Sequence, residues 1–265
     1  LQDAPALIAY MNKHSKTGSY VFFGDSLTWG SYLGRAEVHP YLIQMKTGRS
    51  AFNLGVPGFS DHQLLDFIPY ALKHNETVDA VIQLQYFWDE ASSYTGMDEL
   101  LRTPAMDYSS ALEQIKQDLD QDDAYVDPAQ VPFLQKDVAY QQERIARGKE
   151  LFPQGSHVPA GYRDRLKELA EWMAGRQGQT FYVYMPPYFM EQVEQHSAMS
   201  RKDYEQKVGQ IRDLFANPPN IHFKDMNQLD NTWKAEHFID WWHRTKAGEQ
   251  ELAKQLLQWL EAGRM

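Results

Sequence analysis

The chain has 265 residues, no cysteine and a formal net charge of −10. A chain of this length can form one large domain with a sizeable core, and the missing cysteine excludes disulfides, thiol nucleophiles and cysteine-bound metals. The negative charge argues against nucleic acid or another polyanion as a partner and favours a neutral or acylated sugar.

Helical and strand-like patterns alternate along the first third of the chain. A helical pattern over residues 5–14 precedes the apolar run 19–23, and further helical patterns cover 38–48 and 60–74. The apolar, β-branched segment 78–84 predicts another strand. Strands that alternate with helices predict a parallel α/β sheet.

Residues 90–160 interrupt this alternation with an acidic stretch, several prolines and a polar helical piece over 137–151. We interpret them as an insertion within a single domain of residues 1–265. The insertion would form a lid or an acceptor-binding wall over the site, and the alternative is a decorative cap. The remaining patterns predict a helix at 161–175, a strand at 180–185, a helix at 201–215, a strand at 221–224 and a helix at 245–260.

A serine follows the first predicted strand on a tight turn, in the sequence Gly24-Asp25-Ser26-Leu27. Ligands of open α/β sheets bind outside the carboxyl ends of the strands. A hydroxyl at this place would suit a nucleophile beside an anion-stabilising backbone N–H. The alternative is that Ser26 only caps the helix that follows.

Asp240 and His243 lie three residues apart, just before the last predicted helix. A serine hydroxyl becomes a good nucleophile when an imidazole takes its proton, and a carboxylate must orient that imidazole. The pattern therefore predicts Ser26 as nucleophile, His243 as base and Asp240 as its orienting carboxylate. Alternatively, His243 is a surface histidine and Asp240 is a local cap.

Together these residues resemble the SGNH, or GDSL, hydrolase superfamily, and the segment Asn53-Leu54-Gly55-Val56-Pro57-Gly58 resembles its second sequence block. The resemblance implies a three-layer α/β/α, flavodoxin-like fold. It also implies that the backbone N–H of Gly58 joins that of Ser26 in an oxyanion hole. The alternative for the two glycines is ordinary turn chemistry.

The chain departs from that superfamily after the strand at 78–84. The third block, Gly-x-Asn-Asp, is absent, and the chain reads Gln85-Tyr86-Phe87-Trp88-Asp89. Gln85 is our candidate for the missing oxyanion donor, because its carboxamide can donate as asparagine would. Alternatively, Gln85 and Tyr86 satisfy only local backbone groups. The segment is similar to the D-alanyl transfer protein of teichoic acid synthesis.

This departure favours a relationship to proteins that O-acylate cell-surface polysaccharides. We therefore predict transfer of an acyl group, such as acetyl, with an acyl donor and a carbohydrate or small ester as substrates and a membrane acyltransferase as partner. An esterase or deacetylase is the alternative, and a non-catalytic carbohydrate-binding protein is a third interpretation. Candidate substrate-binding residues are Tyr86, Trp88, Tyr188 and Trp241, although burial is the commoner fate of tryptophan.

Two further expectations concern cofactors and location. No histidine pair has metal-ligand spacing, so we predict neither a metal nor a cofactor. No apolar run is long enough to span a membrane, and the chain begins at Leu1. We expect a periplasmic or other extracytoplasmic protein from which an N-terminal signal or anchor has been removed.

Overall fold

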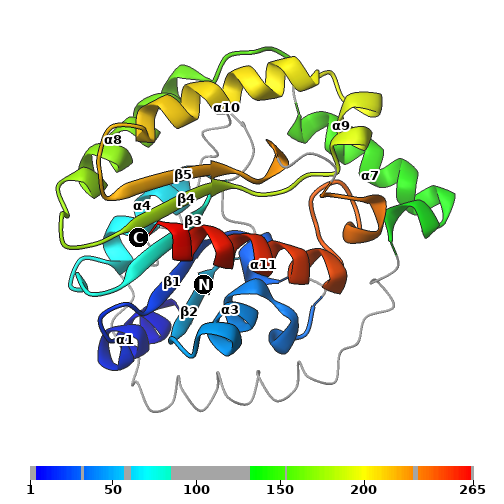
Figure 1. Ribbon diagram of the computed structural model, residues 1–265. Coiled ribbons are helices and arrows are strands. Elements are labelled where there is room, and N and C mark those ends of the chain that lie inside the picture. Colours follow the sequence, from blue (N-terminus) through cyan, green and yellow to red (C-terminus); the bar gives the residue numbers. More distant parts are fainter. Residues whose placement is uncertain are drawn as a thin grey trace.

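Five parallel strands form the centre of the computed structural model, which describes residues 4–30, 33–56, 61–84, 132–152, 154–228 and 232–263 (Figure 1). The strands are β1 (Tyr20–Gly24), β2 (Ala51–Gly55), β3 (Asp79–Gln83), β4 (Phe181–Met185) and β5 (Ile221–Asp225). Their order is β2-β1-β3-β4-β5, and every neighbouring pair is parallel. This confirms the predicted flavodoxin-like class, in which the strand order changes direction between β1 and β3.

Helices cover both faces of the sheet (Figure 1). One face is packed by α1 (Ala4–His14), α4 (Asp61–Ala71), α8 (Ala160–Ala174) and α10 (Arg201–Phe215). The other face is packed by α3 (His39–Thr47) and α11 (Lys246–Ala262).

The remaining helices and turns complete the described structure. They are α2 (Ser26–Trp29), α7 (Val138–Leu151), α9 (Met190–His196) and the 3-10 turns η1 (Arg35–Glu37), η3 (Phe133–Gln135), η4 (Met226–Gln228) and η5 (Ala235–His237). In the described part of the chain, no helix combines the length and apolar character needed to cross a membrane.

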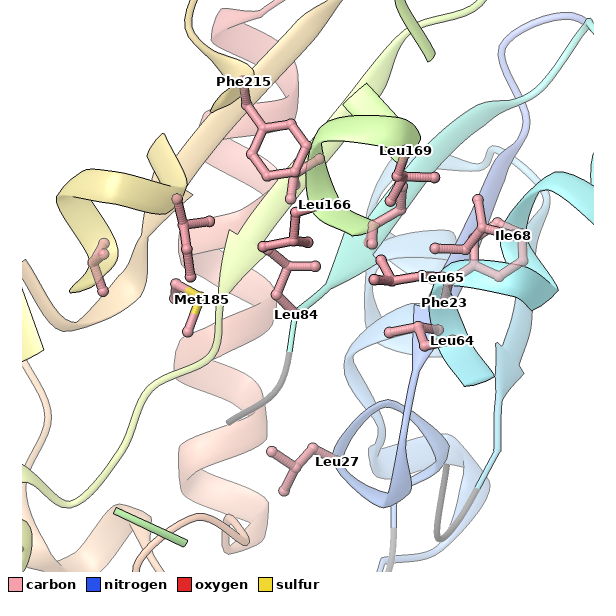
Figure 2. Close-up of a cluster of buried hydrophobic side chains, with 14 of the residues drawn as sticks. Phe23, Leu27, Leu64, Leu65, Ile68, Leu84, Leu166, Leu169, Met185 and Phe215 are labelled. Carbon is pink, nitrogen blue, oxygen red and sulfur yellow. The ribbon is translucent and has the colours of Figure 1, made fainter. Parts of the chain in front are cut away.

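The strands divide their side chains between two cores. Successive residues of a strand point to opposite faces, so Phe23 joins the core under α4 and α8, whereas Phe22 joins the core under α3 and α11. Both phenylalanines are fully buried. Burial on both faces explains why these strands read as continuous apolar runs. Figure 2 shows the first core, in which Leu65 of α4 and Leu166 of α8 lie near Phe23 and Leu84.

Most predicted elements are present, with bounds that differ by one or two residues. The helix expected at 60–74 ends at Ala71, because Lys73 and Asn75 donate to carbonyls three residues back and close tight turns there. Helix α9 was not predicted, since its seven residues are too few to show a clear helical period.

Leu166 tests the importance of the α8 layer. Its side chain is fully buried, whereas Leu134 is 52% exposed. We expect Leu166→Ala to lower the free energy of unfolding by about 2–5 kcal/mol, and Leu134→Ala by less than about 0.5 kcal/mol. Urea unfolding followed by circular dichroism measures both changes, and similar small losses for the two variants would contradict the described packing.

Candidate active site

Ser26 begins α2, directly after the carboxyl end of β1. The Asp25 carboxylate caps this helix by accepting a hydrogen bond from Leu27 N at 2.8 Å. The helix ends at Gly30, whose φ of 91° is the left-handed conformation that glycine adopts without strain. One turn of helix is therefore fixed at both ends, and Ser26 itself stays partly exposed.

The ends of β1 and β2 lie very close to this turn. A Cβ on Gly24 would stand 2.1 Å from Thr28 Oγ1, and one on Gly55 would stand 2.5 Å from Trp29 N. Only glycine leaves room for that approach. These two glycines thus let the turn that carries Ser26 lie directly on the sheet edge.

Asp240 and His243 lie on a loop that closes on itself before α11. Ile239 N donates to His243 O at 2.8 Å, and Thr245 N donates to His237 O at 3.0 Å. Thr245 also caps α11 by accepting a hydrogen bond from Gly248 N at 3.2 Å. The closure brings the aspartate and histidine side chains to one side of the loop.

The three predicted catalytic side chains meet at hydrogen-bond distances. Ser26 Oγ lies 3.3 Å from His243 Nε2, and His243 Nδ1 lies 2.7 Å from Asp240 Oδ2. The arrangement fits an imidazole that donates its Nδ1–H to the carboxylate and accepts the serine proton at Nε2. The serine-to-histidine contact is long for a hydrogen bond, as is common without substrate.

Asp240 is fully buried and satisfies both carboxylate oxygens locally. Oδ1 accepts hydrogen bonds from Trp242 N at 2.9 Å and His243 N at 2.7 Å, while Oδ2 faces the imidazole. Burial acts to raise the pKa of Asp240, but the neighbouring His243 and these hydrogen bonds hold it below its ordinary value. The Asp240 carboxyl is therefore ionised at neutral pH.

A second carboxylate beside the nucleophile has a different role. Asp25 is buried, and its Oδ1 accepts a hydrogen bond from Gln83 Nε2 at 2.8 Å. Gln83 in turn accepts one from Thr28 Oγ1 at 3.0 Å. Gln83, the last residue of β3, thereby binds both Asp25, which precedes α2, and Thr28 within α2. Burial raises the pKa of Asp25, and the hydrogen bonds that it accepts from Leu27 N and Gln83 act to lower it.

Arg244 links the two parts of the site. It follows His243 in the chain, and its Nη2 donates to the carbonyl of Leu27 at 3.0 Å. Its Nε donates to Glu249 Oε1 of α11 at 2.5 Å, and both side chains are 1% exposed. The Arg244 guanidinium therefore connects Leu27 of α2, the residue after Ser26, to Glu249 of α11.

Glu249 also binds α3. Its Oε2 accepts hydrogen bonds from His39 N at 2.9 Å and His39 Nδ1 at 2.7 Å. Burial lowers the pKa of His39, so we assign a neutral imidazole whose Nε2 accepts from Tyr184 OH at 3.3 Å. Burial would raise the pKa of Glu249, but Arg244 and the bonds from His39 lower it to about 2.

Two of the candidate substrate-binding residues, Tyr188 and Trp241, are buried in the described structure. Tyr188 is 1% exposed and Trp241 is fully covered. Both pack against Phe152, with ring centroids 5.2 and 6.1 Å away. Large aromatic surfaces gain most from such burial, and in the described structure these two residues belong to the core.

The other predicted site residues, Gly58, Gln85, Tyr86 and Trp88, lie outside the described residues. Sequence reasoning also missed several residues that contact the triad or support it, namely His39, Gln83, Arg144, Tyr184, Arg244 and Glu249. The one visible signal was Gln83, a polar residue near the end of the mainly apolar run 80–84. Among the described residues, no group of three His, Asp or Glu could hold a metal ion.

Comparison with known proteins gives similarity at the level of the fold. No family profile matches the chain, and no curated protein matches it. A Streptococcus pneumonia protein provisionally described as a platelet activating factor is 16% identical, with a TM-score of 0.52 over 97% of this chain and 91% of that one.

Two further solved structures have the same fold. A member of the lipolytic G-D-S-L family from Veillonella parvula is 12% identical, with a TM-score of 0.50 over 91% of this chain and 97% of that one. LAE5, an α/β hydrolase enzyme from the metagenome of Lake Arreo, is 13% identical, with a TM-score of 0.50 over 92% and 95%. The α/β/α arrangement is thus shared with these hydrolases.

Glu249→Gln tests the buried ion pair through the pH dependence of stability. Because the carboxyl pKa falls from 4.5 to about 2 on folding, its contribution is complete above pH 4.5 and is lost as the pH falls toward about 2. The contribution amounts to about 3 kcal/mol. We expect Glu249→Gln to have a lower free energy of unfolding than the wild type at neutral pH. Its free energy of unfolding should also fall less steeply as the pH drops from 4.5 toward about 2.

Urea unfolding across the acid range measures this slope. Glu261→Gln, which changes an exposed glutamate of the same helix, should keep the wild-type slope. An unchanged slope in Glu249→Gln would show that the Arg244–Glu249 pair does not stabilise the fold electrostatically.

Proposed function

We propose that this chain transfers acyl groups through an ester formed on Ser26. One observation carries the proposal, which is the geometry of Ser26, His243 and Asp240. The serine oxygen is 3.3 Å from the imidazole, and the imidazole is 2.7 Å from a buried, ionised carboxylate. Nucleophile, base and orienting group therefore stand in the order that acyl-enzyme chemistry requires.

In the first half-reaction, the Ser26 proton passes to Nε2 of His243 as Oγ bonds to the carbonyl carbon of the donor. The imidazolium then protonates the leaving oxygen, the bond between that oxygen and the acyl carbon breaks, and the acyl group remains on Ser26. In the second half, His243 takes the proton of the acceptor hydroxyl, whose oxygen attacks the acyl carbon. Asp240 remains ionised throughout and stabilises the imidazolium.

The negative oxygen of each tetrahedral intermediate needs hydrogen-bond donors. As the first residue of α2, Ser26 has a backbone N–H with no partner inside the helix. We propose this N–H, that of Gly58 and the Gln85 carboxamide as the donors. Tyr86 and Trp88 are proposed to contact the substrate, since they follow β3 in the sequence and β3 ends at the same sheet edge as β1, which precedes Ser26.

For the acceptor, we propose a hydroxyl of a cell-surface polysaccharide. The chain lacks the Gly-x-Asn-Asp block after β3 and is similar there to a teichoic acid D-alanyl transfer protein, which supports transfer over hydrolysis. An extracytoplasmic location and a membrane acyltransferase that supplies the acyl group form part of this proposal. A second candidate is ester hydrolysis, which is favoured by the fold shared with the lipolytic protein from Veillonella parvula.

Covalent labelling with a fluorophosphonate tests the activated serine. We expect one adduct on the intact protein, located on Ser26 by mass spectrometry and absent from Ser26→Ala. Because His243 removes the hydroxyl proton, His243→Ala should label at least about 10³-fold more slowly than the wild type. His237→Ala is the matched control, since His237 lies on the same loop but outside the triad, and it should label at the wild-type rate.

An adduct that forms equally fast in His243→Ala would contradict the triad. Folded protein without any adduct would instead favour the third interpretation, a non-catalytic carbohydrate-binding protein with this fold.

Turnover of an aryl acetate with and without a sugar acceptor separates transfer from hydrolysis. A transferase should release the phenol faster when the sugar is present, because the acceptor hydroxyl removes the acetyl group from the acyl-enzyme. It should also yield acetylated sugar. Release at a useful rate in water alone, with no acetylated sugar by mass spectrometry, would identify an esterase. Ser26→Ala gives the uncatalysed background in both reactions.

A further inference from the structure

The helix that carries Ser26 is too short to hold its own shape. Helix α2 consists of the four residues Ser26–Trp29, and a single helical turn is unstable unless other parts of the fold support it. The directions of the Ser26 hydroxyl and of its backbone N–H therefore depend on the contacts that fix this turn to the sheet. Gln83, at the end of β3, makes two of those contacts.

The Gln83 carboxamide binds one side chain on each side of Ser26 in the sequence. Its Nε2 donates to Asp25 Oδ1 at 2.8 Å, and its Oε1 accepts a hydrogen bond from Thr28 Oγ1 at 3.0 Å. Gln83 is fully buried and Thr28 is 1% exposed, so water does not compete for these bonds. Asp25 Oδ1 also accepts from Leu27 N at 2.8 Å, which is the cap of α2. The carboxamide thus holds the cap and the body of the turn at one point of β3.

The chemistry and the packing of this contact both suit a glutamine. An ionised carboxylate only accepts hydrogen bonds and a hydroxyl can donate, so one carboxamide can bind both at once through its NH₂ and its oxygen. Tyr184 OH also lies 3.5 Å from the same Oε1. A Cβ on Gly24 would stand 2.1 Å from Thr28 Oγ1 and 3.1 Å from Gln83 Cβ. The glycine therefore leaves the space in which the threonine reaches the glutamine.

We propose that Gln83 is a positioning residue for the nucleophile and acts through Asp25 and Thr28. The inference rests on the proposed function, and Gln83 is assigned no contact with a reacting atom. Without its two hydrogen bonds the turn would shift, which would change the 3.3 Å contact between Ser26 Oγ and His243 Nε2. The same shift would turn the Ser26 N–H away from the direction that the oxyanion requires. Misplacement of this kind lowers the rate of the chemical step more than the affinity for the substrate.

Saturation kinetics of fluorophosphonate labelling separate a binding constant from a maximal rate. Gln83→Met keeps the length of the side chain and removes its amide donor and carbonyl acceptor. We expect it to lower the maximal rate by about 10–100-fold and to change the binding constant by less than about threefold.

Gln179→Met is the matched control. Gln179 is also buried and makes two hydrogen bonds, one accepted from Arg176 Nε and one donated to Val78 O, at the opposite end of β3. Its loss should lower stability but leave the maximal rate at the wild-type value, because these bonds lie far along the strand from the nucleophile.

Thr28 gives a second test that leaves Gln83 in place. Thr28→Val removes the hydroxyl at nearly constant volume and should lower the maximal rate by about 10-fold. Thr28→Ser keeps a hydroxyl that can donate to Gln83, and it should label several-fold faster than Thr28→Val.

Circular dichroism establishes that each variant is folded at the labelling temperature. A lower maximal rate in Gln83→Met than in Gln179→Met supports the inference. Equal maximal rates in these two variants, or a loss confined to the binding constant, overturn it while the proposed function stands. If Gln83→Met does not fold, the two Thr28 variants decide, and equal rates in both overturn the inference. Wild-type labelling that does not depend on His243 would overturn the proposed function and this inference with it.

Discussion

The carboxylate of Asp240 is the group around which the rest of the site is organised. An ionised group with no exposed surface is costly unless hydrogen bonds and charges compensate it. Here the compensation comes from two backbone N–H groups and the imidazole of His243. Each contact requires the loop to fold back on itself, as the pairing of Phe238 with Arg244 shows. The hydrogen bonds that satisfy this buried charge thus also fix the position of the His243 imidazole.

A second buried charge ties that loop to the nucleophile. Arg244 reaches the carbonyl of Leu27 and is neutralised by Glu249. Replacing the whole of such a pair by well-packed apolar residues often changes stability little, since desolvation offsets much of the attraction, whereas removing one partner leaves a buried charge unpaired. What the pair does supply is a defined geometry, because a guanidinium with one partner on α2 and another on α11 tolerates little displacement. The distance between Ser26 and His243 depends on this connection as well as on the sheet.

The sequence allowed good prediction wherever the signal was local. Apolar runs and helical periods identified β1, β3, β4, β5 and the long helices, and the three residues predicted as a triad lie within hydrogen-bond distance of one another. The support around it could not be predicted, because its partners lie far apart. Arg244 and Leu27 are separated by 217 positions, and His39 and Glu249 by 210. Nothing in either segment identifies the other.

Glutamine near the end of β3 illustrates the same limit. Family resemblance directed attention to Gln85, because the missing block should begin there. The structure shows that Gln83, two residues earlier, holds Asp25 and Thr28. Its place on the strand, opposite Tyr184 in the register of β3 and β4, puts a carboxamide beneath the nucleophile turn. Registers between strands depend on tertiary packing, so a single sequence does not reveal them.

Described residues on either side of positions 85–131 lie against the candidate site. At the end of β3, Gln83 binds the carboxylate of Asp25, the residue before the nucleophile. Where the chain returns in α7, Arg144 lies beside the carboxylate that orients the base. The strand order changes direction between β1 and β3, and ligands of such sheets bind at that point. The candidate site is therefore held by the end of β3 on one side and by α7 on the other.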